Sequence, residues 1–312
     1  MSVIALENTL WVEKYRPKNL SEYIGNNIIK EDADKWIKTN DIPHLLLYGK
    51  AGTGKTSLGK ILVKTIDCDV LYINASDENN VETIRTKIKN FVSSVGFKAL
   101  KVVFLDEADG LTPSAQGILR NIMEQFSKHS RFILTCNYVE KVIDPIQSRC
   151  ATYQIHPPSK NEIAKRIVEI CKLEEVGYDL ESIKIIVNKG YPDIRRVINL
   201  LQQSSSSGKL VISKQASLEF DYMDKILEVL KEKKDAKTLF LKIRQIIADS
   251  KVRTFDDLYR YLYDNLDSFA PNGTQAPVIL HIAKAMQSDV FCVDKEINIM
   301  AMFIEILTEL KG

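Results

Sequence analysis

The sequence lacks the features that mark several common protein classes. Its five cysteines form no Cys-x-x-Cys pair and its four histidines are dispersed, so neither a disulfide framework nor a zinc site is predicted. No signal-type apolar segment opens the chain, and the most apolar late stretch, residues 297–307, is short and contains a glutamate. We therefore expect a cytosolic protein with reduced thiols and no membrane partner.

An excess of charge of one sign is also missing. The 43 Lys and Arg residues nearly balance the 41 Asp and Glu residues, for a net charge of +2. This near-neutral net charge argues against a protein that coats DNA through bulk positive charge. A local basic stripe is still compatible with such a net charge. A length of 312 residues exceeds what one compact core usually holds and predicts two or three domains.

Short apolar runs dominate the first half of the chain. The first four are almost continuously apolar, which is typical of parallel strands covered on both faces. Helical patterns at 55–66, 81–95 and 113–127 separate these runs. Strand alternating with helix predicts a three-layer α/β domain with its ligand at the carboxyl ends of the strands. The five predicted strands are residues 43–49, 69–74, 101–107, 131–137 and 151–156.

After residue 160 the strand patterns stop. Three short helices, at 161–174, 180–189 and 193–203, predict a small helical domain, and the serine-rich stretch 204–208 indicates a linker. The last predicted helix is apolar on nearly every face, so it is either buried in its own bundle or packed on a neighbouring subunit. The remaining predicted helices are 223–234, 236–248, 255–266, 278–287 and 293–310.

The segment GKAGTGKT, residues 49–56, matches the phosphate-binding pattern Gly-x-x-x-x-Gly-Lys-Ser/Thr in full, between a predicted strand and a predicted helix. Its glycines let backbone N–H groups converge on phosphate, and the helix N-terminus adds a favourable field. Lys55 is expected to reach the β- and γ-phosphates and Thr56 to hold Mg²⁺. The predicted nucleotide contacts here are Gly49, Ala51, Gly52, Thr53, Gly54, Lys55, Thr56 and Ser57.

The segment VVFLDEAD, residues 102–109, supplies a second phosphate motif. It places Asp106 at a strand end, where it can hold Mg²⁺ through water, and Glu107 beside it to polarise an attacking water. The two motifs together predict ATP hydrolysis and not binding alone. Asn137 closes the next strand, where it either orients the water or touches the γ-phosphate, or is a plain turn residue. Asn74 ends an earlier strand, where its side chain could hold Glu107 away from water.

Longer stretches resemble the sliding-clamp-loader ATPase subunits of the replication factor C small-subunit and T-even-phage type, within the AAA+ superfamily. By motif, the resemblance covers about two-thirds of the chain. The zinc-binding cysteines of the bacterial loader are absent. Besides the two phosphate motifs, the resemblance rests on WVEKYRPKNLSEYIGN (11–26), INASDE (73–78), LTPSAQGILRNIMEQFSKHSRFILTCNY (111–138), DPIQSRC (144–150) and YPDIRRVINLLQ (191–202).

The resemblance implies roles for individual residues. Arg195 matches the lid arginine that touches the γ-phosphate. The family usually has Gly-Asp-Met-Arg where this chain has Pro-Asp-Ile-Arg, so Arg196 remains an alternative register. Asn74 matches the position that restrains the catalytic glutamate. Contacts to adenine and ribose are implied for Val12, Glu13, Lys14, Tyr15 and Arg16, with Ile24 closing the pocket.

Two arginines are implied to act outside this chain's own nucleotide site. Arg149, in the Ser-Arg-Cys element, is implied to be an arginine finger that acts in trans on the next subunit's ATP, a contribution of roughly 10³–10⁵ in rate. The other interpretation of Arg149 is an ion pair with a carboxylate at a domain edge. Arg85, in the predicted helix 81–95, is expected to contact the DNA backbone and not to read sequence.

The resemblance predicts a AAA+ P-loop domain with a parallel five-stranded sheet (1–157), a helical lid domain (158–209) and an all-α collar domain (210–312). It implies a homo- or hetero-pentameric ring with other clamp-loader subunits, using ATP and Mg²⁺. The ring would open a sliding clamp, grip primer–template DNA and release the closed clamp on hydrolysis. It would work in the cytoplasm at the nucleoid, or in the host cytoplasm if the chain is viral.

Two alternatives remain open. A AAA+ helicase loader or branch-migration motor shares both phosphate motifs but gives no reason for VEKYRP and Ser-Arg-Cys to occur together. A structural ring subunit would bind nucleotide with little turnover. The presence of Lys55, Asp106, Glu107 and Arg149 counts against that second alternative.

Overall fold

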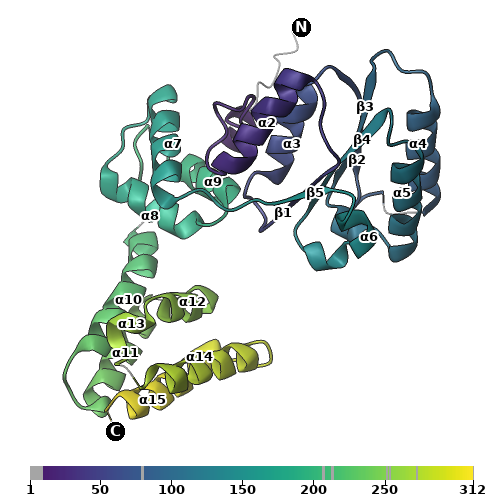
Figure 1. Cartoon of the computed structure of the whole chain (residues 1–312). Coiled ribbons are helices and arrows are strands. Elements are labelled where there is room, and N and C mark those ends of the chain that lie inside the picture. The colour runs from purple at the N-terminus through teal and green to yellow at the C-terminus, as the bar shows by residue number, and fades with distance from the viewer. Residues whose placement is uncertain are drawn as a thin grey trace, which may run out of the picture. The chain divides into compact units, whose positions relative to one another are not determined.

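The computed structural model describes residues 10–78, 81–205, 208–211, 214–250, 252, 254–271 and 273–311. The chain forms two compact units, residues 1–211 and residues 212–312, and each is described by itself. In Figure 1 the first unit runs from purple to teal-green and the second from green to yellow. Within the described ranges, no helix has both the length and the apolar character needed to cross a membrane.

A sheet of five parallel strands forms the centre of the first unit, in the order β2-β3-β4-β1-β5. Almost every residue of β1, β3 and β4 is buried, which explains their near-continuous apolar sequences. The predicted parallel five-stranded sheet is therefore confirmed. The strands are β1 (Leu45–Tyr48), β2 (Cys68–Asn74), β3 (Leu100–Asp106), β4 (Ser130–Cys136) and β5 (Ala151–Gln154).

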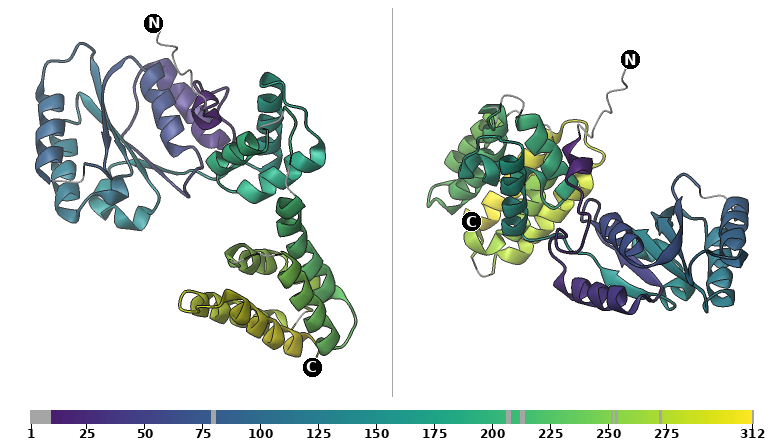
Figure 2. Two further views of the ribbon diagram at one scale, coloured as in Figure 1. Left: turned by 180° about the vertical axis from the view of Figure 1, so that it is seen from behind. Right: turned by 90° about the horizontal axis from the view of Figure 1, so that it is seen from above.

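Helices cover both faces of this sheet, as Figures 1 and 2 show. Leu58 and Ile61 pack with Phe104 in one buried cluster, and Ile88 and Leu119 belong to the cluster on the other face. The result is the predicted three-layer arrangement. Helices α2 (Asn27–Thr39) and α3 (Lys55–Thr65) lie on the first face, and α4 (Val81–Ser93) and α5 (Pro113–Gln125) on the second.

Helix α2 was not predicted from the sequence. It begins after Asn26, whose backbone has the left-handed φ of 52° and whose side chain does not cap the helix. The Asn26 amide instead exchanges two hydrogen bonds of 2.9 Å with the backbone of His156. The usual capping signal at a helix start is therefore absent. Four short elements were also not predicted: α1 (Trp11–Lys14), η1 (Ala108–Gly110), η2 (Val139–Lys141) and α6 (Asp144–Gln147).

Three helices follow the sheet, close to where they were predicted: α7 (Lys160–Leu173), α8 (Leu180–Gly190) and α9 (Ile194–Ser204). Of the predicted linker at 204–208, residues 206–207 lie outside the described residues. Gly177 donates its N–H to the carbonyl of Gly208 at 3.0 Å and accepts from the N–H of Leu210 at 2.8 Å. Residues 208–211 are therefore attached to the helical domain.

In its described residues, the second unit contains helices and no strands, as predicted. The first helix begins at Lys214, against the predicted 223, and the predicted helix 255–266 is divided at Asn265. The last helix buries Phe303 in its own bundle and leaves Ile297 and Ile304 exposed. The helices of the second unit are α10 (Lys214–Lys231), α11 (Ala236–Ser250), α12 (Asp256–Asp264), α13 (Leu266–Phe269), α14 (Gln275–Asp289) and α15 (Lys295–Lys311).

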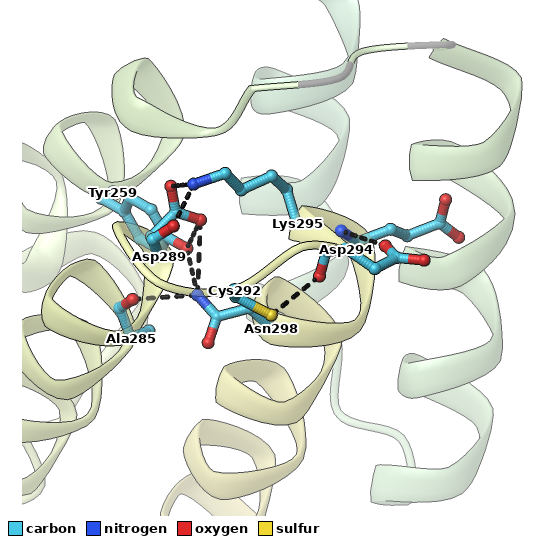
Figure 3. Close-up of polar contacts among 8 residues, drawn as sticks. Tyr259, Ala285, Asp289, Cys292, Asp294, Lys295 and Asn298 are labelled. Atoms are coloured by element: carbon cyan, nitrogen blue, oxygen red, sulfur yellow. Dashed lines mark hydrogen bonds and ion pairs between the residues drawn. The ribbon is translucent and has the colours of Figure 1, made fainter.

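A polar network holds the turn between α14 and α15 (Figure 3). Lys295 pairs with Asp289 at 2.6 Å, and the Tyr259 hydroxyl donates to Asp289 at 3.2 Å. Asn298 donates to the Tyr259 hydroxyl at 3.0 Å and to the carbonyl of Ala285 at 2.9 Å. Tyr259 and Asp289 are buried. Burial alone would raise the pKa of Asp289, but the hydrogen bonds from its partners, Lys295 first, hold that pKa below its ordinary value.

Candidate nucleotide site

A pocket lies at the carboxyl ends of the strands, within the first unit. It is lined by the phosphate loop, by residues from the segment before α2, and by residues of the helical domain. It brings together most of the residues for which a nucleotide or magnesium contact was predicted. The predicted residues that line it are Val12, Tyr15, Arg16, Ile24, Ala51, Gly52, Thr53, Gly54, Lys55, Thr56, Ser57, Asp106, Glu107, Asn137 and Arg195.

The glycines of the phosphate loop adopt a backbone that other residues rarely adopt. Gly49, Gly52 and Gly54 have φ values of 146°, 73° and 100°. A Cβ atom on Gly49 would lie 2.5 Å from the carbonyl oxygen of Ile155, and one on Gly52 would lie 1.8 Å from a carboxylate oxygen of Asp193. Glycine is therefore required both for the conformation and for the close approach.

Lys55 is buried in this loop and oriented by three acceptors. Its Nζ donates to the carbonyls of Gly49 at 2.7 Å and Lys50 at 2.8 Å, and to Oδ1 of Asn137 at 2.9 Å. Burial lowers the pKa of the Lys55 ammonium. Asn137 is itself fixed, because its backbone N–H donates to Asp109 at 3.1 Å. Two predicted site residues are thus in direct contact.

Three hydroxyl groups hold Asp106. Oδ1 accepts hydrogen bonds from Thr56 Oγ1 at 2.8 Å and from Thr135 Oγ1 at 2.5 Å, while Oδ2 accepts one from the Tyr72 hydroxyl at 2.7 Å. Thr135 also accepts the backbone N–H of Glu107 at 3.0 Å. Thr56 and Asp106 are therefore adjacent, as two residues of one magnesium site must be. Neither Thr135 nor Tyr72 was predicted as a site residue.

The carboxylate of Glu107 is held by a residue that the sequence reasoning missed. The Ser76 hydroxyl donates a hydrogen bond to it, and Glu107 itself has the left-handed φ of 58°. The Asn74 side chain instead donates to Asp77 at 2.7 Å and accepts the backbone N–H of Ser76 at 3.2 Å. Asn74 thus shapes the turn that presents Ser76. The only sequence feature that could have indicated Ser76 as a site residue is its position just past the end of a strand.

Two of the residues implied to contact adenine and ribose do not line the pocket. Glu13 pairs with Arg16 at 2.5 Å, and Lys14 pairs with Glu174 at 2.7 Å. They lie on the one-turn helix α1, whose successive side chains point in different directions. Glu13 and Lys14 therefore contact other side chains, whereas Val12, Tyr15, Arg16 and Ile24 line the pocket.

The residues present fit a nucleotide with Mg²⁺. Tyr23 lines the pocket with its ring next to Gly54, and its buried hydroxyl has no hydrogen-bond partner among the described residues. Arg166, from α7, also lines the pocket and brings positive charge. Neither residue was predicted. An unpartnered buried hydroxyl, a glycine cradle and the oxygens of Thr56 and Asp106 suit a phosphate ligand and a hard cation.

Arg195, the predicted lid arginine, lies at the start of α9. The Asp193 carboxylate accepts the backbone N–H groups of Arg195 at 2.9 Å and Arg196 at 3.1 Å, and so caps the helix. Arg195 lines the pocket, and its charge contributes to lowering the pKa of Lys55. Arg196 is not among the lining residues. Of the two arginines, only Arg195 thus lies at the pocket, and its contact with the γ-phosphate stays a prediction.

Arg149 and Arg85 both lie outside the pocket. Arg149 forms an ion pair with Glu124 of α5 and donates to the carbonyl of Pro145 at 2.6 Å. In the single chain, Arg149 therefore forms an ion pair with a carboxylate, which was the other interpretation of this residue. Its side chain remains one-third exposed, at 33%. Arg85 is exposed on α4.

The fold and the site define a P-loop ATPase of the AAA+ type. Residues 45–157 match the family described as ATPase family associated with various cellular activities (AAA). Residues 159–213 match the sliding-clamp-loader large subunit, AAA+ ATPase lid domain. The chain belongs to the sliding-clamp-loader family of AAA+ ATPases.

Its relatives include proteins named replication factor C small subunit. The chain is 41% identical to that of Saccharolobus solfataricus over 214 residues, which are 66% of this chain and 65% of the relative. For Halobacterium salinarum the identity is 43% over 208 residues, 65% of each chain. The chain thus matches just under two thirds of the length of these relatives.

Two solved structures of Thermotoga maritima RuvB variants share the fold. One has a TM-score of 0.54 and the other 0.55, each at 17% sequence identity and covering 92% of this chain and 91% of the other. At this identity the likeness shows the fold alone.

Proposed function

We propose that the chain is an ATPase subunit of a DNA sliding-clamp loader. The observation that carries the proposal is the contact between the two phosphate motifs. Thr56 meets Asp106, and Thr135 joins Asp106 to the backbone of Glu107, in one pocket beside Lys55. The match to a clamp-loader lid domain and the names of the relatives support a clamp loader as the assembly to which this subunit belongs.

In this proposal the chain's residues bind and orient ATP. The adenine lies among Val12, Tyr15 and Ile24, and Lys55 exchanges its carbonyl acceptors for phosphate oxygens. Thr56, and Asp106 through water, would hold Mg²⁺, which would neutralise charge on the phosphates. Arg195 brings the helical lid toward the γ-phosphate.

Glu107 takes the proton of the attacking water as its oxygen bonds to the γ-phosphorus and the bond to the β-phosphate oxygen breaks. Ser76 holds Glu107 until clamp and DNA are in place. Arg149 acts on the neighbouring subunit's ATP, so it must first leave Glu124. Chemistry then requires two adjacent subunits, and assembly of the ring starts turnover.

The implied partners are a sliding clamp, primer–template DNA and the other subunits of a pentameric ring. Arg85 is exposed on α4 and is our candidate for a contact with the DNA backbone. A near-neutral chain can bind DNA in this way because a ring multiplies a few cations per subunit.

A structural ring subunit with little turnover remains the second candidate. The contacts that favour it are those of Glu107 with Ser76 and of Arg149 with Glu124, because both withhold a catalytic group. Phosphate release that is stimulated by clamp and by primed DNA distinguishes the two candidates.

The test of the shared site mixes two variants, Arg149→Ala and Lys55→Ala, in rings assembled with the partner subunits. Each variant alone should hydrolyse ATP slowly. The mixture should regain activity at interfaces that combine an intact Lys55 with a neighbour's intact Arg149. No regained activity, or full-speed turnover by a single chain without clamp or DNA, would contradict the proposal.

A further inference from the structure

The contact between Tyr72 and Asp106 has no part in the mechanism above. Tyr72 lies on β2, the edge strand of the sheet, and pairs with Phe104 of β3. Two residues further along, Asn74 pairs with Asp106, so the Tyr72 and Asp106 side chains share the region where both strands end. The Tyr72 hydroxyl donates to Oδ2 of Asp106 at 2.7 Å.

The tyrosine ring is held from two sides. It stacks on Phe104 with a centroid distance of 4.9 Å, and the ammonium of Lys60 lies 5.1 Å from its centroid. Phe104 is fully buried against Gly59, where a Cβ would lie 2.2 Å from its ring. The missing side chain at Gly59 therefore makes room for the ring on which Tyr72 stacks. The Tyr72 side chain is 43% exposed, and these two contacts orient its ring.

The two carboxylate oxygens of Asp106 have different surroundings. Oδ1 contacts Thr56 and Thr135, close to the phosphate loop, whereas Oδ2 contacts Tyr72. In the second of these contacts the Tyr72 hydroxyl is the donor.

We propose that Tyr72 is a positioning residue for the magnesium site. By holding Oδ2 from the edge of the sheet, it directs Oδ1 of Asp106 toward Thr56 and raises the affinity of the site for Mg²⁺ when nucleotide is bound. This inference rests on the proposed binding of ATP with Mg²⁺, and it adds a residue that neither phosphate motif contains. Partners that orient a metal-binding carboxylate commonly change metal affinity or activity by about 10–100-fold.

The opposite edge of the same sheet provides a matched control. Tyr153 lies on β5, and its hydroxyl donates to Oδ2 of Asp32 at 3.0 Å. Its ring also packs on an aromatic residue, Trp36, at a centroid distance of 5.8 Å. Asp32 belongs to α2 and does not line the pocket. Removing either hydroxyl thus breaks a tyrosine–aspartate bond at a sheet edge, but only one of the two bonds reaches the nucleotide site.

The experiment compares Tyr72→Phe with Tyr153→Phe in the full chain. Binding of a fluorescent, non-hydrolysable ATP analogue is measured during a Mg²⁺ titration and again in EDTA, with circular dichroism to verify folding. Tyr72→Phe keeps the stacked ring, so we expect unchanged binding in EDTA. The Mg²⁺ concentration for half-maximal binding should rise about tenfold. Tyr153→Phe should match the wild type in both measurements.

An unchanged Mg²⁺ requirement in Tyr72→Phe would overturn the inference, and so would an equal shift in Tyr153→Phe. Neither result bears on clamp loading, because the assay contains neither clamp nor DNA. If the wild-type chain binds the analogue equally with and without Mg²⁺, the inference fails but the proposed ATP site does not. If it does not bind the analogue at all, both fail.

Discussion

At the scale of single residues, two groups with proposed catalytic roles contact side chains that they must leave. Glu107 accepts a hydrogen bond from Ser76, and Arg149 pairs with Glu124. Both contacts are exposed to solvent, so each is worth about 1 kcal/mol or less. Contacts of this strength delay a reaction without preventing it, which suits groups that a partner must release.

Replacing Ser76 with alanine should free Glu107. We expect the turnover of the assembled ring without DNA to rise about fivefold, the equivalent of 1 kcal/mol, while DNA-stimulated turnover stays the same. Steady-state phosphate release measures both rates. Ser93→Ala is the control, because that hydroxyl donates to the carbonyl of Lys89 within its own helix, at 2.7 Å. A basal rate in Ser76→Ala equal to that of the wild type would show that the hydrogen bond does not restrain Glu107.

The sequence allowed Lys55, Thr56 and Asp106 to be predicted because their motif spacing fixes them relative to strand ends. Ser76 and Tyr72 could not be predicted in this way. The Ser76 contact depends on the left-handed turn at Glu107, and the Tyr72 contact depends on the register between β2 and β3. Both join residues about thirty positions apart, with no local pattern to announce them.

At the scale of elements, continuous apolar runs located the strands, because both faces of the sheet are covered. Helix ends were less predictable. Helix α2 lacks a capping side chain, and α10 begins nine residues early, at Lys214, in a stretch whose composition is largely polar. The boundaries at 157/158 and 209/210 stay predictions, since the compact units separate only at residue 211.

The packing of α3 against β3 can be tested with alanine at Gly59. A Cβ there would lie 2.2 Å from the buried ring of Phe104, so we expect a loss of roughly 1–3 kcal/mol in the free energy of unfolding. Gly117 of α5 is the matched control, because a Cβ there meets nothing within 4 Å. Gly117→Ala should stabilise the protein by about 0.5–1 kcal/mol.

Urea unfolding followed by tryptophan fluorescence measures both glycine variants. Both tryptophans of the chain, Trp11 and Trp36, lie in the first unit with these helices. Equal free energies of unfolding for Gly59→Ala and Gly117→Ala would contradict the close approach of α3 to Phe104.

At the scale of the whole molecule, two units are joined in one chain, and their unfolding can be followed separately. Tryptophan fluorescence reports only the first unit, whereas circular dichroism reports the helices of both. A change confined to the second unit should therefore appear in the circular dichroism signal alone.

Lys295→Met should produce such a change. It leaves the carboxylate of Asp289 buried without its charged partner, and Lys295 is itself 30% exposed, so we expect a loss of roughly 1–3 kcal/mol. Lys284→Met is the control. Lys284 also pairs with a carboxylate, Glu305, at 2.5 Å, but is 68% exposed, and its loss should cost less than about 0.5 kcal/mol. Equal effects of the two variants, or a shifted tryptophan transition, would contradict this prediction.

The pH dependence of the second unit follows from the same network. The folded state holds the pKa of Asp289 below its ordinary value, about 3.9 in an unfolded chain. The ionised carboxylate therefore stabilises the fold above about pH 4, and that stabilisation is lost as the pH falls through the lower folded pKa. Between pH 5 and pH 2, the circular dichroism transition should weaken more in the wild type than in Asp289→Asn. Parallel pH profiles would show that Asp289 does not titrate in this way.

Lys55 makes three hydrogen bonds to oxygen atoms of the protein itself and is only 7% exposed. Most of the work of dehydrating its ammonium group is therefore done when the chain folds, and not when a ligand arrives. Phosphate oxygens that reach the loop meet a cation already stripped of water, so they only replace one set of oxygen acceptors with another. Dehydrating this ammonium group lowers the stability of the folded chain, and phosphate oxygens that bind Lys55 should restore part of that stability.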